Sequence, residues 1–339
     1  MKTGIYIPAE WESQQEIWTA WPSHDDDDRW PGERLALARS EVAQMVRALA
    51  QGQKVIVLAC GAQSVENAQA QIGNVAAVVP ALFGDTWLRD TGPVFGYDPA
   101  GRLSALRFRH NGWGGKFIYE HDDTVGDFIA EQKDAQIRRF NFILEGGAIE
   151  HDGAGTILTT RQCVLNPNRN KNWSENDAEA ALRESFGAKR IVWLDDGLLN
   201  DHTDGHIDNL ARFVAPGLVA CPAAFGDDDP NAAVYEKTAQ TLIAEGFEIV
   251  RIPSPGLVRD DNGLIVPASH MNFVIGNKAV VMPCYGTESE GAALKILQKL
   301  FPTRTVSAVC SNTLLTGGGS FHCITQQVPV IRSSGKDEI

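Results

Sequence analysis

The 339-residue chain is long enough for one large core or for two modest domains. Its 43 acidic and 30 basic residues give a formal charge of −13, which argues against a nucleic-acid-binding surface and suits the long-range attraction of a cationic substrate. No run of about 18 apolar residues predicts a membrane span, and no secretory signal is recognised. We therefore expect a cytoplasmic protein without a membrane or nucleic-acid partner.

The six cysteines include no Cys-x-x-Cys pair, a pattern that favours neither a zinc site nor the disulfide framework of a small secreted domain. Five of them stand in or beside apolar runs and are expected to be small buried hydrophobic residues: Cys60, Cys163, Cys221, Cys284 and Cys310. Cys323 is the exception, because it follows three glycines in a polar stretch.

Secondary-structure signals recur five times in one order: two short strands, a helix and a further strand. The first unit has a strand at 17–21, a helix at 34–51 and a strand at 54–60, and it lacks one strand of the initial pair. The later units are expected at 94–108, 123–133 and 137–144; at 148–159, 175–186 and 190–194; at 210–221, 232–245 and 248–252; and at 272–282, 290–301 and 305–310. Ser174 is the expected N-cap of helix 175–186, and Gly187 its stop.

A C-terminal strand at 324–330 can supply the strand that the first unit lacks. Its pairing with the N-terminal strand would close a ring of ββαβ units and leave no unpaired sheet edge between the chain ends. No Gly/Ser-rich or Pro-rich linker interrupts the sequence. We therefore predict an α/β fold that forms a single closed domain over residues 1–339.

Polar residues cluster where each strand pair begins. These stretches are 87–93, 145–147, 201–209, 269–272 and 317–323. In a ring of similar units, equivalent positions meet at the central axis, so these stretches would deliver a thiol, an imidazole and three carboxylates to one point. The glycine-rich stretch before Cys323 suits a turn into a structural cysteine equally well when it is considered alone. The convergence favours Cys323 as a nucleophile.

The expected chemistry follows from the charges. His206 and Asp208 are two residues apart, so their side chains share one face of an extended segment. Carboxylates beside a thiol raise its pKa and oppose ionisation, unless the substrate is itself a cation. A planar guanidinium accepts carboxylates along its edges and leaves its central carbon open to the thiol. Trp87 and Trp113 could form flat walls around such a substrate.

Several residues also have simpler interpretations. Asp90 could be a turn residue and Glu145 a turn cap. A metal site is the alternative for His202, Asp204, His206 and Asp208, although it leaves Cys323 unexplained. The acidic run at 25–28 and the segment 166–170 are interpreted as loops.

Four motifs together resemble the agmatine deiminase family, also described as the bacterial-type peptidylarginine deiminases. The motifs are Trp87-x-Arg89-Asp90-Thr91-Gly92-Pro93, Glu145-Gly146-Gly147, Gly205-His206-Ile207-Asp208-Asn209 and Gly317-Gly318-Gly319-x-x-His322-Cys323-Ile324-Thr325-Gln326-Gln327. The likeness runs from Pro8 to Pro329. It implies a five-bladed α/β propeller of the guanidino-group-modifying superfamily, with no metal and no organic cofactor.

By the same resemblance, Cys323 is the nucleophile, His206 the general acid/base, and Asp90 and Asp208 the holders of the guanidinium, while Glu145 orients His206 or contacts a guanidinium nitrogen. Further substrate contacts are expected from Trp87, Trp113, Asp204, Asn272 and Gly318. The implied reaction is hydrolytic deimination of agmatine to N-carbamoylputrescine through a thiouronium on the cysteine. The expected partners are this small cationic substrate and, as one candidate assembly, a second copy of the chain in a homodimer.

Departures from the family pattern concern the substrate more than the reaction. Ser320-Phe321 replaces the more usual Asn-Ile, and the residues before Gly205-His206 also differ. Arg107 and Arg109 share a strand face and could serve a carboxylate-bearing substrate. The alternatives are therefore a deiminase of C-terminal peptidyl-arginine or of another guanidino compound, an amidinotransferase, a non-catalytic guanidinium-binding protein, or a metal-dependent hydrolase.

Overall fold

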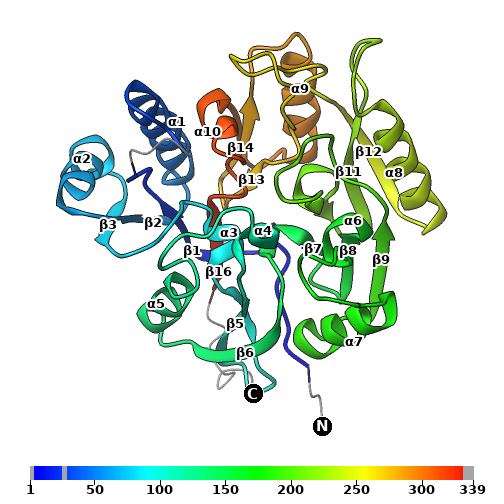
Figure 1. Ribbon diagram of the computed structural model, residues 1–339, viewed down its shortest axis with the longest axis horizontal. Helices are drawn as coiled ribbons and strands as arrows, with labels where there is room; N and C mark the ends of the chain where they lie inside the picture. The colour runs from blue at the N-terminus through cyan, green and yellow to red at the C-terminus, as the bar shows by residue number, and fades with distance from the viewer. Residues whose placement is uncertain (1–3, 25–28, 331–339) are drawn as a thin grey trace.

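The computed structural model describes residues 4–24 and 29–330, so the acidic run at 25–28 lies outside the described residues. Within these ranges the chain forms five small sheets, four with three strands and one with four. The sheets and their helices are arranged around a common centre, where short helical segments meet (Figure 1). This is an α/β fold, as the alternating strand and helix patterns predicted.

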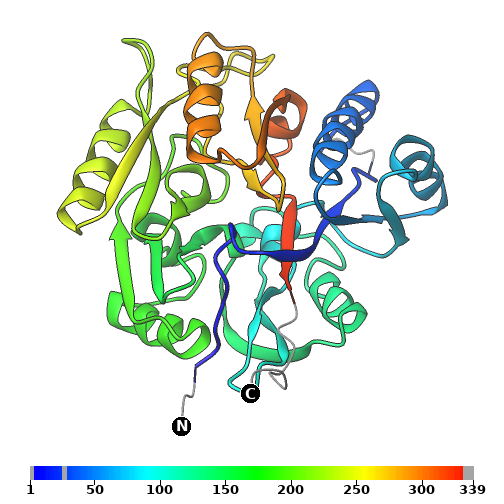
Figure 2. The same cartoon turned by 180° about the vertical axis from the view of Figure 1, so that it is seen from behind.

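The four-stranded sheet joins the two ends of the described chain (Figure 2). Its order is β16 (Thr325–Pro329), β1 (Gln14–Ala20), β2 (Lys54–Ala59) and β3 (Ala77–Pro80). Strand β16 runs antiparallel to β1, with Thr19 opposite Thr325, whereas β1, β2 and β3 are parallel. The predicted pairing of the N- and C-terminal strands is therefore confirmed.

The other four sheets repeat one topology, in which the first two strands are antiparallel and the third is parallel to the second. Their strands are β4 (Val94–Tyr97), β5 (Leu103–Arg109) and β6 (Gln136–Ile143); β7 (Ile149–His151), β8 (Thr156–Thr160) and β9 (Arg190–Leu194); β10 (Arg212–Ala215), β11 (Leu218–Ala223) and β12 (Glu248–Pro253); and β13 (Val274–Ile275), β14 (Ala279–Cys284) and β15 (Thr305–Cys310). The predicted ββαβ units are thus confirmed, within a residue or a few at each boundary.

Each of the five units, including the one with the four-stranded sheet, also contains its predicted helix. The helices are α1 (Glu33–Leu49), α5 (Val125–Gln132), α7 (Glu175–Phe186), α8 (Ala232–Ala244) and α9 (Glu290–Leu300). Helix α7 begins as expected, since the Ser174 hydroxyl accepts the Asp177 N–H while the Asp177 carboxylate accepts from the Ser174 backbone. It ends at Gly187, whose φ of 65° lies in the left-handed region.

Helix α2 (Ala62–Ile72) and strand β3 were not predicted. The helix buries only Ser64, Ala68 and Ile72, because one narrow side of it contacts the protein. Strand β3 is four residues long and has no fully buried residue. Strand β3 therefore shows no buried face, and the buried side of α2, although helically spaced at Ser64, Ala68 and Ile72, contains too few large apolar residues to predict the helix.

The apolar cores lie between neighbouring units and hold them together. Helix α1 packs against β14 and β15 of the adjacent sheet, and one buried cluster contains Val42 of this helix together with Val281 and Val309 of those strands. Helix α9 likewise contacts β12 of the sheet before it. Because each core is shared, a unit cannot bury its apolar face alone.

The cysteine prediction is only partly confirmed. Cys163 and Cys221 are buried, but Cys60 and Cys284 are half-buried and Cys310 is exposed. Cys310 ends β15, an edge strand, so only one of its sides has a neighbouring strand to cover it. No helix within residues 4–24 and 29–330 is both long enough and apolar enough to cross a membrane.

Short helical segments precede the strand pairs and carry the predicted polar residues. They include α3 (Leu88–Thr91), η1 (Gly146–Ala148) and η2 (Ile207–Asn209), whose residues are almost all buried. Segments α3 and η1 contact each other, as do η1 and η2. Further short helices are α4 (Gly112–Gly115), α6 (Arg161–Val164) and α10 (Asn312–Thr316). The starts of different units therefore meet, as the repeat predicted.

Candidate active site

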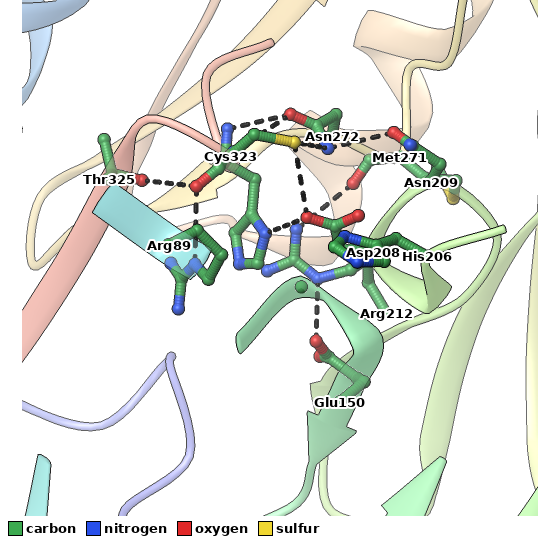
Figure 3. A network of polar contacts seen from close by, with 12 residues as sticks. Arg89, Glu150, His206, Asp208, Asn209, Arg212, Met271, Asn272, Cys323 and Thr325 are labelled. Atoms are coloured by element: carbon green, nitrogen blue, oxygen red, sulfur yellow. Dashed lines mark hydrogen bonds and ion pairs between the residues drawn. The ribbon is translucent and has the colours of Figure 1, made fainter. Parts of the chain in front are cut away.

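Cys323 lies in the loop between α10 and β16 (Figure 3). Its side chain is buried, its Sγ accepts a hydrogen bond from Asn272 Nδ2 at 3.1 Å, and its S–H donates to Asp208 Oδ2 at 3.6 Å. A β-carbon on Gly319 would lie 2.8 Å from the Trp87 ring and 3.0 Å from Cys323 Cβ. Glycine at 319 therefore lets the loop bring the thiol against the tryptophan.

Three other predicted side chains converge around Gly147. A β-carbon at this position would lie 2.6 Å from His206 Nδ1, 3.0 Å from Asp90 Oδ1 and 3.1 Å from Asp208 Oδ2. These residues come from or adjoin α3, η1 and η2, the segments that begin three different units. Residues far apart in the sequence thus share one site, in the manner that the unit pattern predicted.

The oxygens of Asp90 and Asp208 are not equally engaged. Asp90 accepts hydrogen bonds on both oxygens, from the Gly147 N–H at 2.9 Å and from Trp113 Nε1 at 2.8 Å. Asp208 Oδ2 lies 2.8 Å from His322 Nδ1 and accepts from the Cys323 thiol. Asp208 Oδ1 is buried without a hydrogen-bond partner among the described residues. This oxygen is available to a cationic ligand.

Glu145 and His206 also have unused polar atoms. Glu145 Oε1 accepts from Arg169 Nε at 2.8 Å, but Glu145 Oε2 and both ring nitrogens of His206 have no hydrogen-bond partner in the described part of the chain. An oxygen of Glu145 and a ring nitrogen of His206 lie within 4.8 Å of each other. Buried polar groups without partners are rare in folded proteins, so this group of atoms indicates a ligand site.

The electrostatic environment separates the acids. Burial raises the pKa of Asp90 to about 8, with further contributions from the charges of Asp208 and Glu145. Burial also acts on Asp208, but the hydrogen bond and the charge of His322 more than offset it and lower its pKa. Asp208 is therefore ionised at neutral pH, whereas Asp90 is largely protonated in the free protein.

The two candidate reactive groups are both uncharged in the free protein. Burial, together with the charges of Asp208 and Asp90, raises the pKa of the Cys323 thiol well above its ordinary value. Burial lowers the pKa of His206 to about 3, so its imidazole is neutral. A neutral imidazole can accept a proton, and the thiol has one to give.

Aromatic side chains form the walls of the pocket that Cys323 and Asp90 line. Trp87 and Trp113 line this pocket together with Cys323 and Asp90. Phe117, Tyr119 and His202 also line it. Trp113 holds its place with φ 52° and a hydrogen bond to Asp90, and Trp87 Nε1 donates to Asp85 at 3.0 Å. A slot between aromatic faces suits a planar cation or an alkyl chain.

The remaining predicted substrate contacts differ in placement. Gly318 lines the pocket. Asn272 contacts Cys323 and the Asn209 side chain instead of lining the pocket. Asp204 forms ion pairs with Lys116 at 2.7 Å and with Arg169, and it is not among the pocket-lining residues. Its role in substrate binding stays a prediction.

The metal alternative receives little support from the geometry. Among the described residues, the group whose ligand atoms lie within 4.8 Å of one another is Glu145, Cys163 and His206, not the set that sequence spacing suggested. Burial raises the pKa of the Cys163 thiol well above its ordinary value, and the Arg169 guanidinium occupies one oxygen of Glu145. Both features oppose the binding of a cation there.

Sequence analysis missed several buried ionisable residues around the site. Among them are Glu10, Glu150, Arg169, Arg212 and His322. Arg169 lies in the segment interpreted as a loop, yet its side chain is fully buried against Glu145. Arg107, considered there for a carboxylate-bearing substrate, instead bonds Asp127 and the Thr91 carbonyl. The one available signal was the position of His322 beside Cys323 and of Glu10 within the family-like N-terminal stretch.

Comparison with known proteins agrees with the fold and shows the family. The sequence model of the Porphyromonas-type peptidyl-arginine deiminases matches residues 6–329. An agmatine deiminase of Pseudomonas aeruginosa is 36% identical over 98% of this chain and 97% of its own length. Two solved structures, agmatine deiminases of Enterococcus faecalis and of Campylobacter jejuni with substrate bound, each show a TM-score of 0.89 and 30% identity, with 96% of both chains covered.

The fold and the comparisons define an α/β enzyme of the class that hydrolyses guanidino C–N bonds. Within this class, the chain belongs to the agmatine deiminase family, also described as the Porphyromonas-type peptidyl-arginine deiminases.

Proposed function

We propose that this protein is an agmatine deiminase, which hydrolyses agmatine to N-carbamoylputrescine and ammonia. Relatives with this name cover nearly the whole chain at about a third identity. The observation that carries the proposal is a set of buried, unpaired polar atoms, Asp208 Oδ1, Glu145 Oε2 and both ring nitrogens of His206, on residues of which Asp208 contacts the Cys323 thiol and His206 adjoins Asp208 around Gly147. A guanidinium, with N–H groups along all its edges, can satisfy the two carboxylate oxygens at once.

Substrate binding is proposed to reverse the charge state of the site. Asp90, with its pKa of about 8, ionises when a guanidinium provides the compensating charge. The same cation lowers the pKa of the Cys323 thiol, which burial and the two aspartates otherwise raise. The thiolate then forms only beside a cationic substrate, and this selects against neutral amides.

In the first stage, His206 accepts the thiol proton and Cys323 Sγ attacks the central guanidinium carbon. The tetrahedral adduct collapses when the His206 imidazolium returns that proton to the departing nitrogen, so ammonia leaves and a thiouronium remains on the sulfur. In the second stage, His206 takes a proton from water, the oxygen adds to the same carbon, and the carbon–sulfur bond breaks. His206 returns its proton to the thiolate, the proton left on the added oxygen is lost to solvent and is taken up by the released ammonia, and the product is a neutral ureido compound.

Glu145 is proposed to orient His206 in both stages. One of its oxygens is fixed by Arg169, and a carboxylate oxygen lies within 4.8 Å of a ring nitrogen of the histidine. The carboxylate also stabilises the imidazolium that forms transiently. Trp87 and Trp113 are proposed to hold the alkyl chain of agmatine between their rings.

The scaffold for this site is proposed to be a single five-bladed α/β propeller over residues 1–339. Five sheets, a common strand order within the units, and the pairing of β1 with β16 support it. Closure of the ring explains why segments from several units face the same pocket.

The proposal is tested by measuring ammonia and N-carbamoylputrescine from agmatine without any added amine. We expect one of each per agmatine consumed. Arginine, methylated arginines and a peptide with C-terminal arginine test the alternative deiminase substrates, and product formed only with an added amine would identify an amidinotransferase. Activity lost in a chelator would indicate a metal-dependent hydrolase. Absence of turnover on every guanidino compound would overturn the assignment.

A further inference from the structure

Five buried side chains, alternately acidic and basic, form a continuous chain, and Figure 3 shows three of them, Asp208, Arg212 and Glu150. In order they are Asp208, His322, Glu10, Arg212 and Glu150. His322 Nδ1 lies 2.8 Å from Asp208 Oδ2, and His322 Nε2 lies 3.0 Å from Glu10 Oε2. Arg212 then bridges Glu10 to Glu150, whose Oε2 accepts from Arg212 Nε at 3.0 Å.

Both ring nitrogens of His322 face carboxylate oxygens. A neutral imidazole carries only one N–H, so one of these two contacts would then place two acceptors against each other. A doubly protonated ring donates to both carboxylates and forms two charge-assisted hydrogen bonds. Only 2% of the residue is exposed, and a small cavity lined by Glu10, Glu150 and His322 adjoins it. The geometry therefore assigns an imidazolium to His322.

Glu10 is fixed from several sides. Its Oε1 accepts from the Ile275 N–H at 2.7 Å, and its Oε2 is shared by His322 and Arg212. Although burial alone would raise it, the pKa of Glu10 is lowered by Arg212 and His322. The charged groups that face His322 are thus Asp208 from η2, Glu10 from the segment before β1, and the more distant Arg89, Arg212 and Glu150.

The histidine determines which oxygen of Asp208 is used. Oδ2 is occupied by His322 and the Cys323 thiol, while Oδ1 is left unpaired and buried. The carboxylate cannot turn about its axis without breaking the bond to His322. The imidazolium also places a positive charge one residue from the nucleophile in an otherwise acidic site.

We propose that His322 is a positioning residue for deimination: its imidazolium, anchored by Glu10, holds Asp208 ionised with Oδ1 directed to the guanidinium and offsets the negative charge around Cys323. The role in deimination rests on the proposed function. The charge state of the ring and its effect on the thiol do not, because both can be measured without turnover.

The first test uses His322→Gln, which keeps one hydrogen-bond donor and removes the charge. Mass spectrometry of the Cys323 peptide follows alkylation by iodoacetamide across pH, without agmatine. We expect the thiol to titrate at higher pH in the variant and its alkylation at neutral pH to slow about tenfold. An unchanged alkylation profile would overturn the proposal, whether or not agmatine is a substrate.

The second test measures agmatine binding in the Cys323→Ala background, with and without His322→Gln, and kcat/KM across pH with the thiol present. We expect binding to weaken about tenfold or more and the acidic limb of kcat/KM to move to higher pH, because Asp208 loses the donor that keeps it ionised. If His322→Gln has only a lower melting temperature, with agmatine binding and both limbs of the pH profile of kcat/KM unchanged, His322 has a purely structural role.

Glu10→Gln and Glu16→Gln form a matched pair of controls. Glu16 is also a buried carboxylate near the N-terminal end, and its Oε1 pairs with Lys133 at 2.8 Å, away from the pocket. We expect Glu10→Gln to shift the thiol profile in the same direction as His322→Gln, and Glu16→Gln to affect only stability. Equal shifts of the thiol profile in Glu10→Gln and Glu16→Gln would contradict the proposal that Glu10 acts on the thiol through His322. In ¹⁵N NMR of the wild type, both ring nitrogens of His322 should carry a proton, and a single protonated nitrogen would refute the imidazolium.

Discussion

Two aspartates of the proposed guanidinium site have opposite pKa shifts. We call the side with Asp90 and Trp113 the front, and the side with Asp208 and His322 the rear. Asp90 at the front has only neutral donors, the Gly147 N–H and the Trp113 indole, and its pKa is raised to about 8. Asp208 at the rear contacts His322, and its pKa is lowered. Both are buried, so the presence of a cationic partner decides the charge, and burial does not.

This difference divides the work of binding. In the proposed function, the rear carboxylate, Asp208, is an anion before the substrate arrives and attracts it. The front carboxylate becomes an anion only when the substrate supplies the positive charge. If both were ionised in the free protein, the site would be less stable and the thiol harder to ionise.

The largest expected effect comes from removing the Cys323 thiol, whose pKa both Asp90 and Asp208 raise. Cys323→Ala should lower turnover of agmatine at least about 10⁴-fold, since no other group can form the thiouronium, while binding is largely retained. Calorimetric titration of the variant with agmatine measures binding, and an ammonia assay measures turnover. Cys221→Ala removes another buried thiol, in β11, and should retain turnover. Residual activity near the wild-type value would refute Cys323 as the nucleophile.

Replacing each aspartate in turn should separate the front from the rear. Asp208→Asn and Asp90→Asn should both lower kcat/KM by about 10²–10³-fold, because each loses a charged contact to the guanidinium. Their stabilities should move in opposite directions. Asp208→Asn leaves the buried His322 charge with only one of its two carboxylates, Glu10, and should cost about 3–5 kcal/mol. Asp90→Asn removes a carboxyl that resists ionisation and should raise the melting temperature at pH 8. A loss of stability in both variants would contradict the comparison.

Agmatine binding should release protons from the front of the site. Below pH 8 Asp90 binds a proton in the free protein, and this proton leaves when the guanidinium arrives. Affinity should therefore rise with pH toward about 8 and then level. The stability of the free protein should show the opposite trend, because a raised carboxyl pKa gives stability that is present below its unfolded value and lost as pH rises through about 8. Calorimetry of Cys323→Ala in buffers of different ionisation enthalpy counts the protons, and a count of zero at pH 7 would refute the assignment.

The smallest expected effect concerns one hydrogen bond to the front carboxylate. Trp113→Phe keeps an aromatic wall but removes the indole N–H that donates to Asp90. The pKa of Asp90 should rise further, and kcat/KM at pH 7 should fall about tenfold, with partial recovery at higher pH. Trp18→Phe is a suitable control, because its indole donates to Glu16 in β1. A loss in Trp113→Phe that is independent of pH would mean that the indole acts by shape alone.

The repeating units and the convergence of their first residues could be predicted from sequence, because period and turn chemistry are local signals. Helix α2 could not, since its polar sequence buries little. The family resemblance supplied roles for Asp90 and Asp208, but their different charge states depend on Trp113 and His322, whose contacts exist only after folding. His322 stood next to the nucleophile in the sequence, yet its ring serves Asp208 and Glu10, and no local pattern indicates such a pairing.

The pairing of β1 with β16 has a consequence for synthesis on the ribosome. Strand β16 follows Cys323 directly, so the sheet that opens the fold is completed only after the nucleophile has been translated. Until then β1 exposes one edge, and Asp90 and Asp208 do not have the Cys323 thiol beside them. A nascent chain therefore cannot be partly active: the final strand completes the architecture and delivers the reactive sulfur in the same event.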